Sequence, residues 1–103
     1  MTKPEYITFI AFDGDKAVGH VIGGSKDISY RKVKIAEIME MGVSPNYRSQ
    51  GIGAELIKKL REWCKDNGYQ KLFVNAYCKN KKGIAFYERQ GFQSIDISFE
   101  MDP

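Results

Sequence analysis

The stretch Tyr47-Arg48-Ser49-Gln50-Gly51-Ile52-Gly53-Ala54 follows an apolar run and opens an amphipathic segment. Its two glycines stand one residue apart at the predicted start of a helix, so backbone N–H groups there point outward with no side chain in the way. The N-terminus of a helix also carries partial positive charge, which favours anions. The stretch therefore predicts a pocket for a phosphate or a pyrophosphate.

Three known kinds of phosphate-binding loop have to be compared with this stretch. A P-loop ends in Gly-Lys-Ser/Thr, whereas Gly53 is followed by Ala54 and Glu55. A Rossmann loop needs a third glycine where this chain has Leu56, and no βαβ unit precedes it. The third pattern, Arg/Gln-x-x-Gly-x-Gly/Ala directly after a strand, is met by residues 48–53. This pattern resembles the pyrophosphate loop of the GNAT superfamily of acyl-CoA-dependent N-acetyltransferases.

Length and composition predict one globular domain over residues 1–103. The chain is 43% apolar and 28% charged, and it contains no run of about eighteen apolar residues that would span a membrane. Its N-terminus lacks the apolar core of a signal peptide. Cys64 and Cys78 lack metal-ligand spacing, so we expect reduced thiols, no metal and a cytoplasmic location.

The charge balance argues against a nucleic-acid partner. A net charge of +3 is small, and the basic residues are spread along the chain apart from the cluster Lys79-Asn80-Lys81-Lys82. A nucleic-acid binder of this size usually shows a denser basic face with interleaved aromatic residues. We therefore expect no nucleic acid and no membrane among the partners. A basic nucleic-acid-binding domain is kept as a third alternative function.

The pattern of residues predicts a mixed sheet with two helices. Asp13-Gly14-Asp15 has the chemistry of a hairpin turn, and apolar residues recur every four positions from Ile52 to Cys64, as in a helix packed on a sheet. Asn67-Gly68 ends that helix. The expected elements are strands at 6–12, 16–23, 33–43, 71–77 and 92–101, helices at 51–67 and 81–90, and a loop at 24–32.

The second half of the chain strengthens the resemblance. The stretch from Asn80 to Phe92 looks like the family signature Asn-x-x-Ala-x-x-Phe-Tyr-x-x-x-Gly-Phe, with Gly83 where alanine is usual. The resemblance covers residues 5 to 101. It implies a GNAT-like α+β or α/β fold, with a mostly antiparallel mixed sheet, a splayed parallel central strand pair and at least two packing helices.

Transfer of an acetyl group from a thioester to an amine needs a base, because a lysine-like amine has a pKa of about 10.4. The strand at 33–43 offers Glu37 and Glu40, which strict alternation places on opposite, otherwise apolar faces. Desolvation on a doubly covered strand would raise the pKa of either carboxylate toward that of a useful base. We expect Glu40 to be the base, with Glu37 second. Other possibilities stay open: both carboxylates act, through water, or one of them simply pairs with a nearby lysine or faces solvent at a strand end.

The resemblance also implies the other site residues. Tyr87 corresponds to the general acid that protonates the departing thiolate, and the Gly42 N–H would reach the oxyanion. His20, on a hairpin arm far from these motifs, is expected to be an ordinary strand residue, and Trp63 is expected to serve packing. Neither is assigned a catalytic role. The residues expected to contact acetyl-CoA are Met41, Gly42, Val43, Arg48, Ser49, Gln50, Gly51, Ile52, Gly53, Ala54, Asn80 and Tyr87, with Asn75 a weaker candidate.

The leading hypothesis is an acetyl-CoA-dependent N-acetyltransferase that acts on a primary amine of a small molecule or peptide by direct attack. Family members usually carry a further strand and one or two helices before the point that corresponds to residue 5. In the family these elements commonly form one wall of the acceptor site, and we expect this wall to be absent, shortened or supplied by another subunit. An exposed sheet edge also favours a homodimer. The alternative is a truncated, non-catalytic acyl-CoA-binding or regulatory module.

Overall fold

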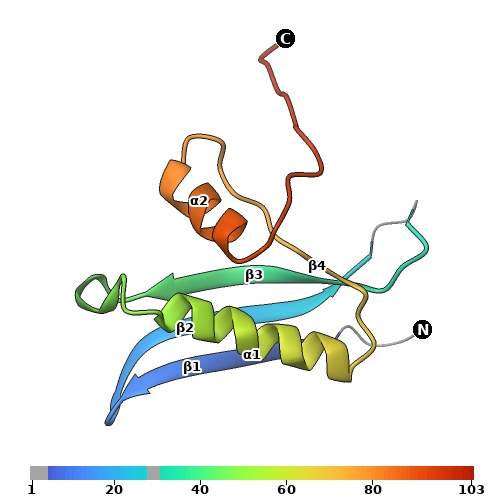
Figure 1. The fold of residues 1–103 in the computed structure, drawn as a ribbon. Coiled ribbons are helices and arrows are strands. Elements are labelled where there is room, and N and C mark those ends of the chain that lie inside the picture. The colour runs from blue at the N-terminus through green and yellow to red at the C-terminus, as the bar shows by residue number, and fades with distance from the viewer. Residues whose placement is uncertain (1–4, 28–30) are drawn as a thin grey trace.

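The computed structural model describes residues 5–27 and 31–103. Part of the loop expected at 24–32 lies outside the described residues, as do residues 1–4. Figure 1 shows the arrangement of the elements, which follow in chain order: β1 (Tyr6–Asp13), β2 (Lys16–Lys26), β3 (Ile35–Val43), the short 3-10 helix η1 (Pro45–Tyr47), α1 (Ile52–Asp66), β4 (Lys71–Phe73) and α2 (Lys81–Arg89).

The described strands form one four-stranded sheet in the order β1-β2-β3-β4. β1, β2 and β3 pair antiparallel, and β4 pairs parallel to β3 after the chain crosses over through α1. The β1–β2 hairpin turns at Gly14, whose φ of 59° favours glycine. This mixed sheet with two helices confirms the fold class expected from the sequence.

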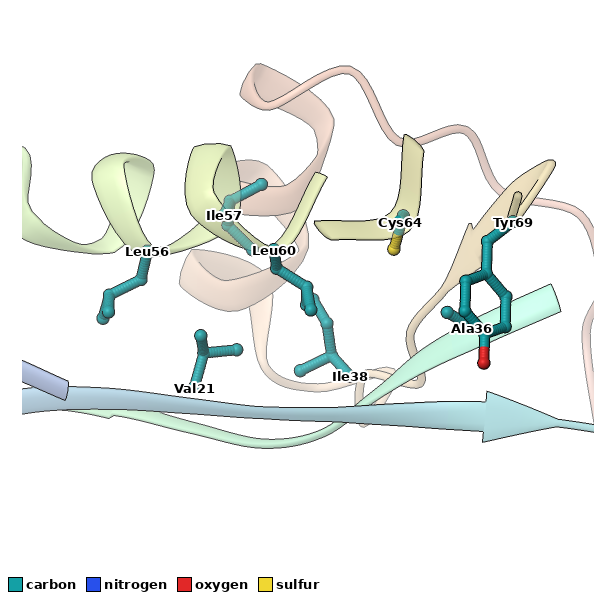
Figure 2. Packing of buried hydrophobic residues seen from close by; sticks show 8 residues of the cluster. All are labelled: Val21, Ala36, Ile38, Leu56, Ile57, Leu60, Cys64 and Tyr69. Atoms are coloured by element: carbon teal, nitrogen blue, oxygen red, sulfur yellow. The ribbon is translucent and has the colours of Figure 1, made fainter. Parts of the chain in front are cut away.

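The core lies between α1 and one face of the sheet (Figure 2). Leu60 is fully buried, and Gly23 on β2 lets it approach, because a Cβ at that glycine would come within 2.6 Å of Leu60 Cδ1. Trp63 stacks on Tyr69 with ring centroids 5.1 Å apart, which agrees with its expected packing role. The buried cluster comprises Val21, Ala36, Ile38, Leu56, Ile57, Leu60, Cys64 and Tyr69.

Several predicted strands differ from the structure. β2 continues to Lys26 rather than residue 23, because the first residues of the expected loop at 24–32 extend its ladder with β3, and β3 begins at Ile35 rather than residue 33. β4 ends at Phe73 rather than Tyr77, because its ladder with β3 stops at the pair Glu37–Phe73 and the following residues have no strand neighbour. The strand predicted at 92–101 is absent: these residues leave the end of α2 and run away from the sheet (Figure 1). A strand needs a neighbouring strand for its main-chain hydrogen bonds, and none lies beside this segment.

Within residues 5–27 and 31–103, no helix has the length and apolar character needed to cross a membrane.

Candidate functional site

The loop before α1 leaves several main-chain donors without partners. Gly51 is the N-cap of α1 with a φ of 85°, and among the described residues no side chain caps this helix end. The first helical hydrogen bond runs from the Glu55 N–H to the Gly51 carbonyl at 3.1 Å. The N–H groups of residues 52–54 precede it and therefore have no acceptor within the helix. Ser49 also has a positive φ, of 64°, which is uncommon outside glycine and asparagine.

Arg48 and Gln50 fold back onto their own loop. The Arg48 Nε donates to the Val43 carbonyl at 3.1 Å, and the Gln50 Nε2 donates to the Asn46 carbonyl at 3.2 Å. These bonds tie the loop to the end of β3. The guanidinium keeps further N–H groups, so Arg48 adds positive charge beside the bare helix end.

Gly53 has a packing role as well as a place in the loop. A Cβ at Gly53 would lie 3.1 Å from Phe86 Cζ of α2 and 3.4 Å from Met41 Cε of β3. The absence of a side chain therefore lets α1 and α2 approach each other at the head of α1. The phosphate-loop pattern predicts no contact of this glycine with α2, because nothing local in the sequence reports the distance between the two helices.

β3 is paired on both sides at its start and on one side only at its end. The parallel ladder with β4 covers Ile35 to Glu37, after which the two strands part. We call the side of residues 38–43 that faces away from β2 the open edge. This parting agrees with the splayed strand pair that the sequence predicted.

The ladder between β2 and β3 decides which main-chain groups reach the open edge. The Ser44 N–H donates to the Val18 carbonyl at 2.8 Å. Because the direction of main-chain groups alternates along a strand, Gly42 points its groups toward His20 on β2, whereas Met41 and Val43 point theirs toward the open edge. This register conflicts with the predicted donation from the Gly42 N–H to an oxyanion and favours its two neighbours.

A bulge on β3 brings both candidate bases to one face. Ile22 lies opposite Glu40 and Gly23 lies opposite Ile38, so Met39 has no partner on β2. The extra residue reverses the alternation, and Glu37 and Glu40 share the face of the sheet opposite α1. The prediction that they occupy opposite faces was wrong because it assumed strict alternation.

The two glutamates have different partners. Glu37 pairs with Lys26 at 3.2 Å, and the Lys26 ammonium also lies 4.7 Å from the centre of the Phe73 ring. Glu40 pairs with His20, with 3.1 Å between Oε1 and Nε2. The Glu40 side chain is 65% exposed, so among the described residues no second layer desolvates it as the sequence analysis expected. His20 was predicted to lie far from the site, and the strand register instead brings it beside Glu40.

Tyr87 lies on the other side of β3 from the glutamates. It packs against the core cluster on the α1 side, with its ring centre 5.5 Å from those of Phe86 and Phe92. Burial raises the pKa of the Tyr87 phenol because it disfavours the charged phenolate. The phenol therefore stays protonated at neutral pH, as a proton donor must.

Asn80 has a structural function in α2. Its Oδ1 accepts from the Gly83 N–H at 3.1 Å and so caps the helix. A Cβ at Gly83 would lie 2.4 Å from Asn80 Nδ2, which explains why glycine suits this position when the family pattern has alanine. The Asn80 side chain is thus already engaged at the helix start.

A groove of about 440 Å³ runs between β1 and the first half of α1. Phe9 and Ala11 line it from β1, and Ile52 and Leu56 line it from α1. Of the predicted cofactor-binding residues, Gln50, Gly51 and Ile52 line it, whereas no candidate catalytic residue and no residue of 38–43 does. The groove therefore adjoins the loop before α1 but not the open edge of β3.

The sequence of this chain is similar to those of known acetyltransferases. Residues 1–92 match the acetyltransferase (GNAT) family. An uncharacterized N-acetyltransferase of Methanocaldococcus jannaschii is 35% identical over 94% of this chain and 43% of its own length. N-alpha-acetyltransferase 30 of Schizosaccharomyces pombe is 30% identical over 86% of this chain and 58% of its own length.

Solved structures show the same fold. A putative acetyl transferase from Pyrococcus furiosus superposes with a TM-score of 0.87 at 28% identity, over 96% of this chain and 66% of that one. An aminoglycoside N-acetyltransferase in complex with CoA, AAC(6')-Iy, superposes with a TM-score of 0.81 at 17% identity, over 93% and 75%. The chain spans about half the length of the two relatives named above. From its loop, its split strand pair and these matches, the chain belongs to the GNAT acetyltransferase family.

Proposed function

We propose that this chain catalyses acetyl-CoA-dependent N-acetylation of a primary amine on a small molecule or peptide. The observation that carries the proposal is the position of the bare N-terminus of α1 directly after the open edge of β3. One end of an extended cofactor can pair with a free strand edge while a diphosphate lies at a helix N-terminus. Acetyl-CoA has this combination of an extended pantetheine arm and a diphosphate.

The residues that would hold the substrate follow from the geometry. The main-chain groups of Met41 and the N–H of Val43, whose carbonyl accepts from Arg48, are available to the pantetheine arm. The N–H groups of Ile52, Gly53 and Ala54 are available to the diphosphate, with Arg48 adding charge. The loop residues Ser49, Gln50 and Gly51 complete this set through their main chain, and Asn80 contributes its Nδ2 group, since only its Oδ1 is used in capping α2.

Direct transfer of the acetyl group uses two side chains, Glu40 as the base and Tyr87 as the acid. The acceptor ammonium gives a proton to Glu40, and the free amine nitrogen then attacks the thioester carbonyl carbon. The C–N bond forms, the tetrahedral oxyanion is held by main-chain N–H groups at the open edge, and the C–S bond breaks. The thiolate takes the proton of the Tyr87 phenol, and the new amide nitrogen loses its second proton to solvent. Solvent then returns a proton to the Tyr87 phenolate and takes one from Glu40, so the net reaction releases one proton. Base and acid lie on opposite sides of β3, which suits a thioester placed along the open edge between them.

The test separates the nucleotide end of the cofactor, which includes the diphosphate, from the pantetheine arm. We expect CoA to bind in calorimetry and pantetheine, which lacks the diphosphate and the adenosine 3'-phosphate, to bind at least tenfold more weakly. Equal affinities would place the diphosphate away from α1. Gly53→Val is a less direct probe, because it would also push against Phe86. Thiol release is then measured with acetyl-CoA and polyamines, amino sugars, amino acids and peptides.

A non-catalytic acyl-CoA-binding module is the second candidate. The observation that favours it is the exposure of Glu40, which lacks the covered surroundings of a strong base. The module predicts CoA binding without thiol release for every amine in the panel. Release with any amine, lost in Glu40→Gln, excludes it. A nucleic-acid-binding domain, the third alternative, predicts salt-sensitive oligonucleotide binding with no response to CoA.

A homodimer is also part of the proposal. Ile95, Ile97, Phe99 and Met101 alternate with polar residues and are 66% to 92% exposed. Such a segment has the pattern of a strand without a neighbour, and a sheet edge of a second copy would supply one. We expect the chain to sediment as a dimer and Phe99→Asp to sediment as a monomer. A monomeric native chain would contradict the dimer.

Both cysteines are free, in keeping with the proposed cytoplasmic location.

A further inference from the structure

We propose that His20 is a positioning residue that holds Glu40 at the open edge of β3 in the geometry needed for proton removal. The inference rests on the proposed function, in which Glu40 is the base. It goes beyond that function by giving a role to the single histidine of the chain. Sequence reasoning assigned His20 no role because twenty residues separate it from Glu40 and only the strand register joins them.

The position of the imidazole depends on the residue opposite it. His20 lies directly across the ladder from Gly42. A Cβ at Gly42 would be 3.1 Å from His20 Cε1, so the ring occupies the space that a side chain at position 42 would take. Gly42 therefore lets the imidazole lie over β3 toward the residue two positions earlier, which is Glu40. Nε2 and Oε1 meet at 3.1 Å.

Among the described residues around His20, Glu40 is the one charged side chain that the pairing of the strands places beside the imidazole. The residue across the ladder on β1 is Ile10, and the neighbours on the same face of β2 are Val18 and Ile22. None of these titrates. The other ion pair of this face, Lys26–Glu37, lies further along the strands.

The direction of the hydrogen bond follows from the chemistry of the two groups. An ionised carboxylate only accepts, so Nε2 carries the hydrogen and donates to Oε1. This bond occupies Oε1 and restricts rotation of an otherwise exposed side chain. Oε2 then remains free to accept the acceptor ammonium proton. A long, exposed glutamate without such a partner would sample many rotamers, few of them productive.

The Lys26–Glu37 pair offers an internal comparison. It lies on the same face and joins the same two strands, but it sits where β3 is paired on both sides. A side chain that positions a base is useful where the strand is open. The His20–Glu40 pair is the one at that place.

The experiment compares three variants of the whole chain. His20→Leu keeps the apolar packing and removes the donor, and we expect kcat to fall about tenfold with the KM for acetyl-CoA unchanged. His20→Gln places an amide donor near the former Nε2 position, and we expect it to restore most of kcat. In the Glu40→Gln background, His20→Leu should cost nothing further, because its effect acts through Glu40.

Three results would overturn the inference. They are a wild-type kcat in His20→Leu, no recovery in His20→Gln, and a further tenfold loss when His20→Leu is added to Glu40→Gln. If the wild-type chain binds CoA but releases no thiol, the proposed function itself fails, and that result is distinct from all three. Circular dichroism melting of each variant checks that the fold is retained.

The pair itself is testable without turnover. Because His20 is the only histidine, its imidazole resonances in an NMR spectrum need no assignment. We expect these resonances to move in Glu40→Gln and to stay in place in Glu37→Gln. Unmoved resonances in Glu40→Gln would overturn the contact on which the inference depends.

Discussion

The two halves of β3 contrast within one strand. Its first half, Ile35 to Glu37, is paired with β2 on one side and β4 on the other, and Ile35 and Ala36 are buried. Its second half, Glu40 to Val43, is paired with β2 only. The first half holds the sheet together, whereas the second presents main-chain groups and a carboxylate to whatever lies along the open edge.

The comparison teaches how similar residues acquire different roles. Glu37 and Glu40 share a face and each has a cationic or donor partner. Glu37 is held between Lys26 and the strand neighbour Phe73, so its pair closes the junction of three strands. Glu40 is held by one side chain and is otherwise open to solvent. The local pairing of the strand, rather than residue type, separates the carboxylate at the paired junction from the one that we propose as the base.

The largest expected effect separates the two glutamates. We expect Glu40→Gln to lower kcat about 100-fold, because a neutral amide cannot take the amine proton, and Glu37→Gln to lower it less than threefold. The loss should be greatest at lower pH, where more of the acceptor is protonated. Thiol release is measured for both variants at several pH values. An equal loss in both would show that the open edge does not select the base.

Tyr87 tests the opposite side of β3. Removing its hydroxyl in Tyr87→Phe should lower kcat about tenfold with CoA affinity retained, because the ring and its contacts with Phe86 and Phe92 remain. Calorimetry measures the affinity and thiol release measures kcat. Wild-type turnover in this variant would remove Tyr87 from the mechanism and confine the chemistry to the Glu40 side.

The smallest expected effect concerns stability at the start of β3, where the strand is paired on both sides. Near its start, the Tyr69 hydroxyl donates to Glu5 Oε1 at 2.6 Å, and Lys34 bonds the same oxygen at 3.1 Å. Burial, and then the bond to Glu5, raise the pKa of Tyr69 to about 12. An unfolded tyrosine titrates near pH 10. The folded chain therefore holds the extra proton between these values, so this contribution to stability is complete below pH 10 and is lost as the pH rises toward 12.

Chemical denaturation at pH 9 and pH 11.5 measures this loss. We expect the fall in the free energy of unfolding to be smaller in Tyr69→Phe than in the native chain, because the variant has no hydroxyl to titrate. Thiol release at pH 8 is the control and should be unchanged in the variant. A fall of equal size in both chains would show that Tyr69 does not contribute to the pH dependence.

Much of the fold was predictable because its signals are local. The hairpin turn at Asp13-Gly14, the four-residue repeat of α1 and the end of that helix at Asn67 depend on residues close in sequence. The strand predicted at 92–101 shows the limit of this reasoning. Its alternation is clear, yet alternation only states which face would be buried, and pairing needs a neighbour that the described chain lacks.

The sequence by itself determined the hairpin, the amphipathic α1 and the bare loop at its head, because periodicity and turn chemistry act within a few residues. Only the tertiary structure decided the bulge at Met39, the meeting of His20 with Glu40 and the contact of Gly53 with Phe86. These depend on the register between strands and on the distance between helices. Residues far apart in the chain set both of these together, through packing that no local pattern records.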